Sequence, residues 1–395
     1  MTFLNKTTKL TYMETIYFDN NATSPIDNQV LEILVNTLQL ELKNPASQHG
    51  PGRQSRKQLE ITRKQVGGFL GGNQQGSTED TTVFTSGGTE ANNLALLGIC
   101  AAFPQRGRLI ISGIEHPSIT VAAKILEKDG WDLRVIHTLH NGKIDLEHLG
   151  SLLNDKTRLV SVMLANNETG VIQPITEVVA QCKNHGALVH TDAVQAVGKM
   201  SVDFQLLGVD ALSLSAHKIH GPVGVGALLI KNGCPVAPIL YGGFQQNGLR
   251  PGTEACPLPV ALSKTLELYL NSQDANVSRL LDLRLRLENG LLRLFPSAVV
   301  VGQESLRLPQ TTCVSFPGVD RQALMMALDV AGVCCSTGSA CSSGSSETSP
   351  TLMAMGVAED VVEGAIRFSQ SIFNTPAEID SVIDILSGVL PLLSE

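Results

Sequence analysis

One lysine near the middle of the chain stands between two histidines. Residues 212–222 (LSLSAHKIHGP) alternate apolar and polar side chains and then place Lys218 between His217 and His220, just before a Gly-Pro break. This pattern is typical of a short strand that ends in a polar turn, and ligands of α/β proteins bind at strand ends. Lysine is usually a solvated surface charge. Held among polar groups in a cleft with a lowered pKa, it can instead form a Schiff base.

A glycine turn follows another strand-like segment. Residues 81–85 (TTVFT) predict a strand, residues 86–90 (SGGTE) a turn, and residues 91–97 the opening of a helix. Free backbone N–H groups and the helix dipole at such a junction favour phosphate. The turn lacks both the Gly-Lys-Ser/Thr of a Walker loop and the GxGxxG dinucleotide motif. It is therefore either a different phosphate site or an ordinary strand-to-helix connection.

Other polar motifs also follow predicted strands. They lie at residues 115–116 (EH), 166–170 (NNETG) and 192–195 (DAVQ). The carboxyl ends of parallel strands share one edge of a sheet, so these side chains are expected to converge on Lys218.

The elements that must position these motifs alternate along the chain. Strands are predicted at residues 108–112, 132–136, 159–164, 187–192, 210–215 and 224–230, with helices between them at 119–128, 146–153 and 175–185. Such βα repeats predict an α/β fold, with a mostly parallel sheet flanked by helices. From about residue 258 a long helical stretch, 259–294, leads into a smaller α+β region. We expect a disordered leader at residues 1–15, a large α/β domain at 16–270 whose first residues pack on the small domain, and a small C-terminal domain at 271–395.

Composition narrows the possible partners. The chain has 395 residues and a net charge of -8, which disfavours nucleic acid and anionic membranes as main partners. No apolar run is long enough for a membrane span, and the first fifteen residues lack the apolar core of a secretory signal. The cysteines form no CxxC pair, which argues against a metal site and for a reducing, cytoplasmic location. They are Cys100, Cys182, Cys234, Cys256, Cys313, Cys334, Cys335 and Cys341.

Taken together and in order, the motifs resemble those of cysteine desulfurases in the class V aminotransferase family. These enzymes have the type I fold of pyridoxal 5′-phosphate (PLP) enzymes. The resemblance covers about residues 17–383. It rests on residues 85–90 (TSGGTE), 115–116 (EH), 166–168 (NNE), 190–192 (HTD), 215–218 (SAHK), 250–253 (RPGT), 339–341 (SAC) and 366–369 (IRFS).

The resemblance implies roles for the residues around PLP. Lys218 would bind the cofactor and move the substrate's α-proton, Asp192 would face the pyridine nitrogen, and His116 would stack on the ring and carry protons. Asn167 and Gln195 would bind the ring oxygen, and Asn167 would also face the substrate. The phosphate would be held by Gly88, Thr89, Ser215 and His217, and by Thr253 of the other subunit of a homodimer.

The resemblance also implies the substrate and the reaction. Arg367 would grip the α-carboxylate of L-cysteine, and the Cys341 thiolate, in a loop rich in Gly and Ser, would attack its sulfur. The products would be L-alanine and a Cys341 persulfide that passes to an acceptor protein or thiol for iron-sulfur cluster or thio-cofactor biosynthesis.

Two segments depart from the family pattern, and two alternatives remain. Residues 242–248 (GGFQQNG) lack the usual acid and base before the RPGT motif, and residues 346–350 (SETSP) replace Leu-Glu-Pro-Ser after the cysteine loop. We expect altered interface pairing and altered loop anchoring there. The alternatives are another class V enzyme, such as a selenocysteine lyase, aminotransferase or epimerase, and a non-catalytic sulfur-relay or scaffold protein.

Overall fold

A seven-stranded sheet forms the centre of the larger part of the molecule. The computed structural model describes residues 15–40, 42–338 and 348–393. The strand order is β2-β8-β7-β6-β5-β3-β4, with every neighbouring pair parallel except those made by β8. The strands are β2 (Thr81–Thr85), β3 (Arg108–Ser112), β4 (Asp132–Ile136), β5 (Thr157–Ser161), β6 (Leu188–Asp192), β7 (Ala211–Ser215) and β8 (Gly226–Ile230).

The prediction of a mostly parallel sheet is confirmed, and β8 is its antiparallel exception. Only residues 216–225 connect β7 to β8. A parallel return needs a crossover of roughly a dozen residues or more, usually through a helix. The chain therefore turns back directly, which leaves Lys218 in the tight connection at the end of β7.

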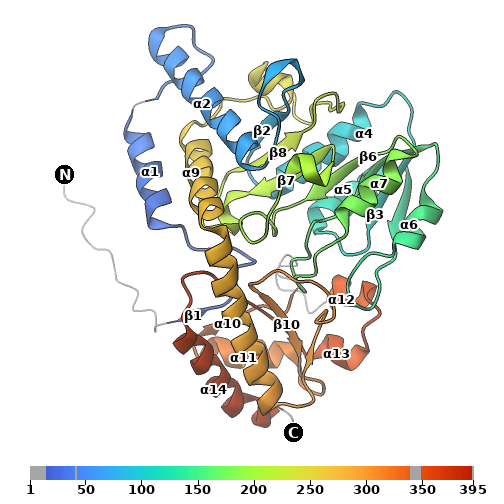
Figure 1. The fold of residues 1–395 in the computed structure, drawn as a ribbon, viewed down its shortest axis with the longest axis vertical. Helices are drawn as coiled ribbons and strands as arrows, with labels where there is room; N and C mark the ends of the chain where they lie inside the picture. Colours follow the sequence, from blue (N-terminus) through green and yellow to red (C-terminus); the bar gives the residue numbers. More distant parts are fainter. Residues whose placement is uncertain (1–14, 41, 339–347, 394–395) are drawn as a thin grey trace.

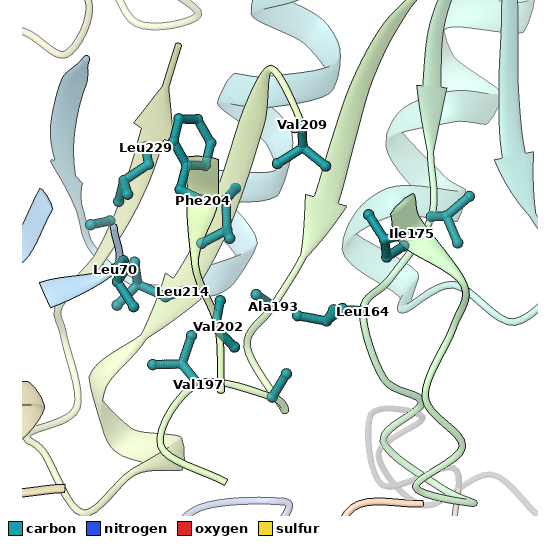
Figure 2. Close-up of a cluster of buried hydrophobic side chains, with 14 of the residues drawn as sticks. Leu70, Leu164, Ile175, Ala193, Val197, Val202, Phe204, Val209, Leu214 and Leu229 are labelled. Carbon is teal, nitrogen blue, oxygen red and sulfur yellow. The ribbon is translucent and has the colours of Figure 1, made fainter. Parts of the chain in front are cut away.

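Helices cover both faces of this sheet (Figure 1). Successive residues along β8 show why: Leu228 lies in one buried cluster and Leu229 in another, as expected for a strand buried on both faces. Figure 2 shows part of the Leu229 cluster, in which Leu70, Val197 and Leu214 point toward one another. The helices of this part are α1 (Asn28–Gln39), α2 (Gly50–Phe69), α3 (Gly88–Asn93), α4 (Ile99–Ala101), α5 (Pro117–Lys128), α6 (Leu146–Leu152), α7 (Ile175–Lys183), α8 (Phe204–Leu207) and α9 (Pro257–Asn271).

Helix α5 illustrates how the local sequence sets an element. His116 caps its first turn, and Pro117 occupies the first helical position, where a missing N–H costs nothing. Ile119, Ala123 and Leu126 are buried, at the spacing of one helix face. The cap holds His116 at the sheet edge.

The remaining elements build a second, smaller unit. It contains the antiparallel sheet β12-β10-β9 and its own buried cluster, to which Phe18 from the beginning of the chain contributes. Helix α10 runs from the larger unit into this one (Figure 1). The elements are β1 (Ile16–Tyr17), α10 (Gln273–Leu294), β9 (Val299–Val300), β10 (Thr311–Ser315), α11 (Arg321–Val330), β11 (Val333–Cys334), α12 (Pro350–Ala354), α13 (Glu359–Glu363), β12 (Ala365–Ser369) and α14 (Pro376–Leu393).

Strand β1 pairs in parallel with β11, so the first described strand lies against the smaller unit. The helical stretch predicted at residues 259–294 is two helices, α9 and α10, which meet at Ser272. The domain boundary near residue 270 stays a prediction. Within the described ranges, no helix is long and apolar enough to cross a membrane.

Candidate active site

A cavity of about 500 Å³ lies where strands β6 and β7 end. Asp192 is the last residue of β6 and Ser215 the last of β7, so the cavity occupies the expected edge of the sheet. Ten residues predicted for the site line it: Gly88, Thr89, His116, Asn167, Asp192, Gln195, Ser215, His217, Lys218 and Arg367.

Among the described residues predicted for the site, Thr253 does not line this cavity. Thr253 lines a separate cavity of about 100 Å³, together with Gln246 and Arg250. Cys341 lies outside the described residues; Gly338, shortly before it, lines the large cavity.

Lys218 is held by the turn that follows β1. Its Nζ donates hydrogen bonds of 2.6 Å to the carbonyl oxygens of Asn21 and Ala22. The Asn21 side chain in turn donates to the carbonyl of Asn167 at 3.1 Å. The amine therefore has a fixed place at the cavity wall, set by residues far away in the sequence.

Asp192 presents a fixed carboxylate to the cavity. Asn92 Nδ2 donates to its Oδ2 at 2.7 Å, and the backbone N–H of Val194 donates to its Oδ1 at 2.9 Å. Asn92 also donates to Ser118 Oγ at 2.9 Å. Both carboxylate oxygens are thus oriented, and the group stands ready to meet a cationic N–H.

One end of the cavity suits an anion. Ser215 Oγ is buried and has no hydrogen-bond partner among the described residues. Gly88 opens α3, where a Cβ would come within 2.8 Å of Val194, so the backbone approaches the cavity wall closely. Burial and the nearby charges of Lys218 and Lys199 lower the pKa of His217 to about 4, which leaves a neutral imidazole there at pH 7.

His116 has a defined ring orientation. Its Nδ1 accepts the backbone N–H of Ser118 at 3.1 Å and lies 2.7 Å from Ser118 Oγ. A nitrogen that accepts an N–H carries no proton, so the neutral ring bears its proton on Nε2.

Arg367 brings a buried cation to the cavity from β12. Its side chain donates to the carbonyl of Asn167 at 3.1 Å and to Asp19 Oδ1 at 2.6 Å. Its Nε is buried without a partner among the described residues. A buried guanidinium with an unused donor suits a small carboxylate ligand.

Glu115, next to His116, is a second buried acid near Asp192. Its Oε1 accepts hydrogen bonds from Ser112 Oγ at 2.6 Å and from the Met163 N–H at 2.8 Å, while Oε2 has no partner in the described structure. Burial, reinforced by the charge of Asp192, raises the pKa of Glu115 to about 8. Glu115 is therefore mostly protonated at neutral pH.

This shift predicts a pH dependence of stability. The raised pKa in the folded state means that folding opposes ionisation of Glu115, so stability falls as pH rises from about 4.5 through about 8. Between about pH 6 and about pH 9, the free energy of unfolding should fall by roughly 2–4 kcal/mol less in Glu115→Gln than in the parent, because glutamine does not ionise. Urea unfolding at both pH values measures this, with exposed Glu147→Gln as the control. Parallel pH profiles for Glu115→Gln and the parent would contradict the prediction.

The seven described cysteines are poor nucleophiles. Burial raises the pKa of every one of them, to about 12 for Cys100, Cys182, Cys234, Cys313 and Cys335, to about 11 for Cys256, and above the ordinary value for Cys334. The thiolate is the reactive form, so burial disfavours all seven as sulfur nucleophiles. In the part of the chain that the structure covers, no group of three or more His, Cys, Asp or Glu could hold a metal ion.

The two unusual segments make specific contacts. Gln246 receives the Phe84 N–H at 2.7 Å and donates to the Phe84 carbonyl at 2.8 Å. Ser349 caps α12 and donates to Glu168 at 2.6 Å, and Thr351 donates to the same carboxyl at 3.1 Å. The expected changes in interface pairing and loop anchoring stay predictions.

Comparisons with known proteins agree with this site. The family model for class V aminotransferases matches residues 16–382. A cysteine desulfurase of Sinorhizobium fredii is 40% identical over 97% of this chain and 98% of its own. The cysteine desulfurase NifS of Azotobacter vinelandii is 37% identical over 94% of this chain and 91% of its own. The chain belongs to the cysteine desulfurases of the class V aminotransferase family.

Solved structures show the same fold. A NifS-like protein matches with a TM-score of 0.88 and 35% identity, covering 96% of this chain and 100% of its own. The structure of SspA in complex with cysteine matches with a TM-score of 0.80 and 27% identity, covering 91% and 100% of the two chains. The predicted type I fold and family are thus confirmed. The relatives favour a desulfurase over the alternative class V activities and over a non-catalytic role.

Three groups that shape the site were not predicted from the sequence. The carbonyls of Asn21 and Ala22 hold Lys218, and Asn92 orients Asp192. Backbone carbonyls leave no signature in a sequence. Asn92, however, lies within a predicted helical segment, where asparagine has a low propensity. This mismatch could have indicated a functional contact of its side chain, which the structure shows to be buried.

Proposed function

We propose that this protein is a PLP-dependent cysteine desulfurase in which Lys218 and Cys341 carry the chemistry. The overall reaction is L-cysteine plus the Cys341 thiol giving L-alanine plus a Cys341 persulfide, in which all atoms balance. The observation that carries the proposal is the single cavity lined by Lys218, Asp192, His116 and Arg367. Purified protein should be yellow and should release alanine and sulfide from L-cysteine with a reductant. A colourless protein, or one that forms no alanine, would reject it.

The lining of the cavity fits PLP. The unpartnered Ser215 Oγ, the backbone at Gly88 and Thr89, and neutral His217 would hold the phosphate. The oriented carboxylate of Asp192 would face the pyridine nitrogen, Asn167 and Gln195 the ring oxygen, and Lys218 the carbonyl carbon. A volume of about 500 Å³ suits a cofactor of this size together with a small amino acid. When bound, PLP supplies an electron sink that stabilises negative charge at the substrate's α-carbon.

The chain's own residues do the remaining work. Lys218, with its Nζ on two carbonyl oxygens, is placed to take the α-proton, and His116 Nε2 can donate a proton inside the cavity. Arg367 binds the substrate carboxylate and so fixes the orientation of the substrate in the cavity. By its resemblance to the family's loop cysteine, the Cys341 thiolate would then attack the substrate sulfur.

Arg367→Gln should weaken substrate binding. Replacing the guanidinium removes charge-assisted hydrogen bonds, so kcat/KM for L-cysteine should fall by roughly 10²-fold or more, mainly through KM. Steady-state alanine formation measures this, and the visible spectrum checks that the cofactor is retained. The matched control is Arg293→Gln, on an exposed part of α10. An unchanged KM would show that another group binds the carboxylate.

A homodimer would complete the cofactor site. Thr253 lies outside its own chain's large cavity, and two aromatic side chains nearby, Tyr241 and Phe244, are 90% and 95% exposed. An exposed aromatic pair of this kind is typical of an interface. We propose that this surface meets its two-fold copy, so that Thr253 reaches the partner's phosphate site.

Phe244→Ser should weaken that dimer. In a two-fold dimer both subunits lose the buried Phe244 ring, so the dimer dissociation constant should rise by at least about 10²-fold. Analytical ultracentrifugation across a dilution series measures it. Leu206→Ser is the control, because Leu206 is an apolar residue 80% exposed on a different element, α8. A Phe244→Ser dimer as tight as the parent's would place the interface elsewhere.

The final acceptor is a thiol of a small molecule or of a protein that assembles iron-sulfur clusters or sulfur-containing cofactors. The persulfide sulfur leaves Cys341 by attack of that thiol. Incubating persulfide-loaded protein with candidate acceptors and following the transferred sulfur tests this step.

A further inference from the structure

A second lysine, Lys199, lines a small cavity together with Lys218, and it has no part in the proposed mechanism. Lys199 is 8% exposed, and none of the ion pairs between described residues includes it. Burial and the charges of Lys218 and Arg367 lower its pKa to about 7. His217 and His220 are the other titratable groups that feel its charge. A buried lysine without a carboxylate partner is costly, which calls for a role.

A chain of hydrogen bonds joins the two lysines. Lys199 Nζ donates to Gln195 Oε1 at 3.2 Å, and Gln195 Nε2 donates to the Asn21 carbonyl at 3.0 Å. The same carbonyl accepts Lys218 Nζ at 2.6 Å. Gln195 therefore sits between Lys199 and the carbonyl that holds Lys218.

The partners of Gln195 allow only one orientation of its amide. The Lys199 amine in its charged form is only a donor, and the Asn21 carbonyl is only an acceptor. Rotating the amide by half a turn would set its NH₂ against the ammonium and its oxygen against the carbonyl. Lys199 and Asn21 thus fix which atom of the amide lies on which side, in a residue that lines the large cavity.

Lys199 also faces a small cavity that is separate from the large one. It measures about 20 Å³ and is lined by both lysines and by Asn20, Gln310 and Gln370. Each of these three amides has a buried polar atom without a partner in the described structure. The space has room for about one water molecule, which would receive the remaining N–H groups of Lys199 and join them to these amides.

We propose that Lys199 is a positioning residue that fixes Gln195 with its amide nitrogen toward the ring oxygen of PLP. The inference rests on the proposed function, because it requires PLP in the large cavity. An N–H donated to the ring oxygen stabilises negative charge there and makes the adjoining nitrogen, contributed by Lys218, less basic. Without Lys199 only the Asn21 carbonyl orients the amide, so the amide turns more readily and that nitrogen becomes more basic.

The test is a pH titration of the visible absorption band of the holoenzyme without substrate. Lys199→Met keeps an unbranched side chain one atom shorter and removes its donors, and it should move the midpoint up by about one pH unit, a tenfold change in the ratio of the two forms. Lys199→Arg keeps the charge and the donors, so its midpoint should lie close to the parent's. A Lys199→Met midpoint equal to the parent's would overturn the inference.

A double variant separates positioning from simple charge. In a Gln195→Leu background there is no amide to orient, so adding Lys199→Met should move the midpoint little. An equal shift in both backgrounds would mean that Lys199 acts through its charge alone, and would overturn the positioning role. Since the readout needs bound PLP but no turnover, failure of the parent to bind PLP would reject the proposed function, whereas unchanged midpoints in yellow variants would reject only this inference.

Discussion

Lys218→Ala protein should be purified without colour and should form alanine from L-cysteine at least about 10³-fold more slowly than the parent. General acid–base catalysis alone contributes about 10²–10⁴-fold, and this variant also loses the covalent attachment of the cofactor. Absorbance spectra and a timed alanine assay measure the two effects. The matched control is Lys124→Ala, an exposed lysine on α5, which should keep both colour and rate.

The nearby Lys199 makes this experiment sharper. Borohydride reduction of the parent should fix PLP to Lys218 alone. If reduction labelled Lys199 instead, or if Lys218→Ala stayed yellow and active, the assignment of Lys218 would be wrong.

Cys341→Ala protein should keep its colour and lose turnover. Its cofactor site is intact, so the visible spectrum should match the parent's. Alanine formation should fall by at least about 10²-fold, because the attacking thiolate is absent. Cys334→Ala is the matched control, since Cys334 is only partly buried. A Cys341→Ala enzyme with full activity would mean that another thiol or the solvent accepts the sulfur.

The succession of strands and helices, and the parallel sheet that they build, could be predicted from local sequence patterns. Alternating strand and helix segments implied the parallel sheet, and strand ends placed Asp192 and Lys218 at one edge, because parallel strands with helical crossovers all end on the same side. The antiparallel direction of β8 was not predicted, although the connection at residues 216–225 is too short for the crossover that a parallel strand needs. The break between α9 and α10 at Ser272 was missed because no Gly or Pro marks it in the sequence.

The contacts that hold the site residues in place could not be predicted from the sequence. Lys218 rests on carbonyls from residues 21 and 22, and Arg367 pairs with Asp19, so both depend on how the first strand packs against the smaller unit. Pairings between residues hundreds of positions apart follow from the packed fold and not from local propensity. Lys199 carries no local signal either, because only its burial distinguishes it from a surface lysine.

The most direct test of the account is to find where the sulfur goes in a single turnover. Holoenzyme is mixed with one equivalent of L-cysteine without reductant, alkylated, digested and analysed by mass spectrometry alongside an alanine assay. We predict one alanine for each persulfide, with the extra sulfur on the peptide that contains Cys341. Alanine without a persulfide, or a persulfide on one of the seven other cysteines, would contradict the proposed mechanism.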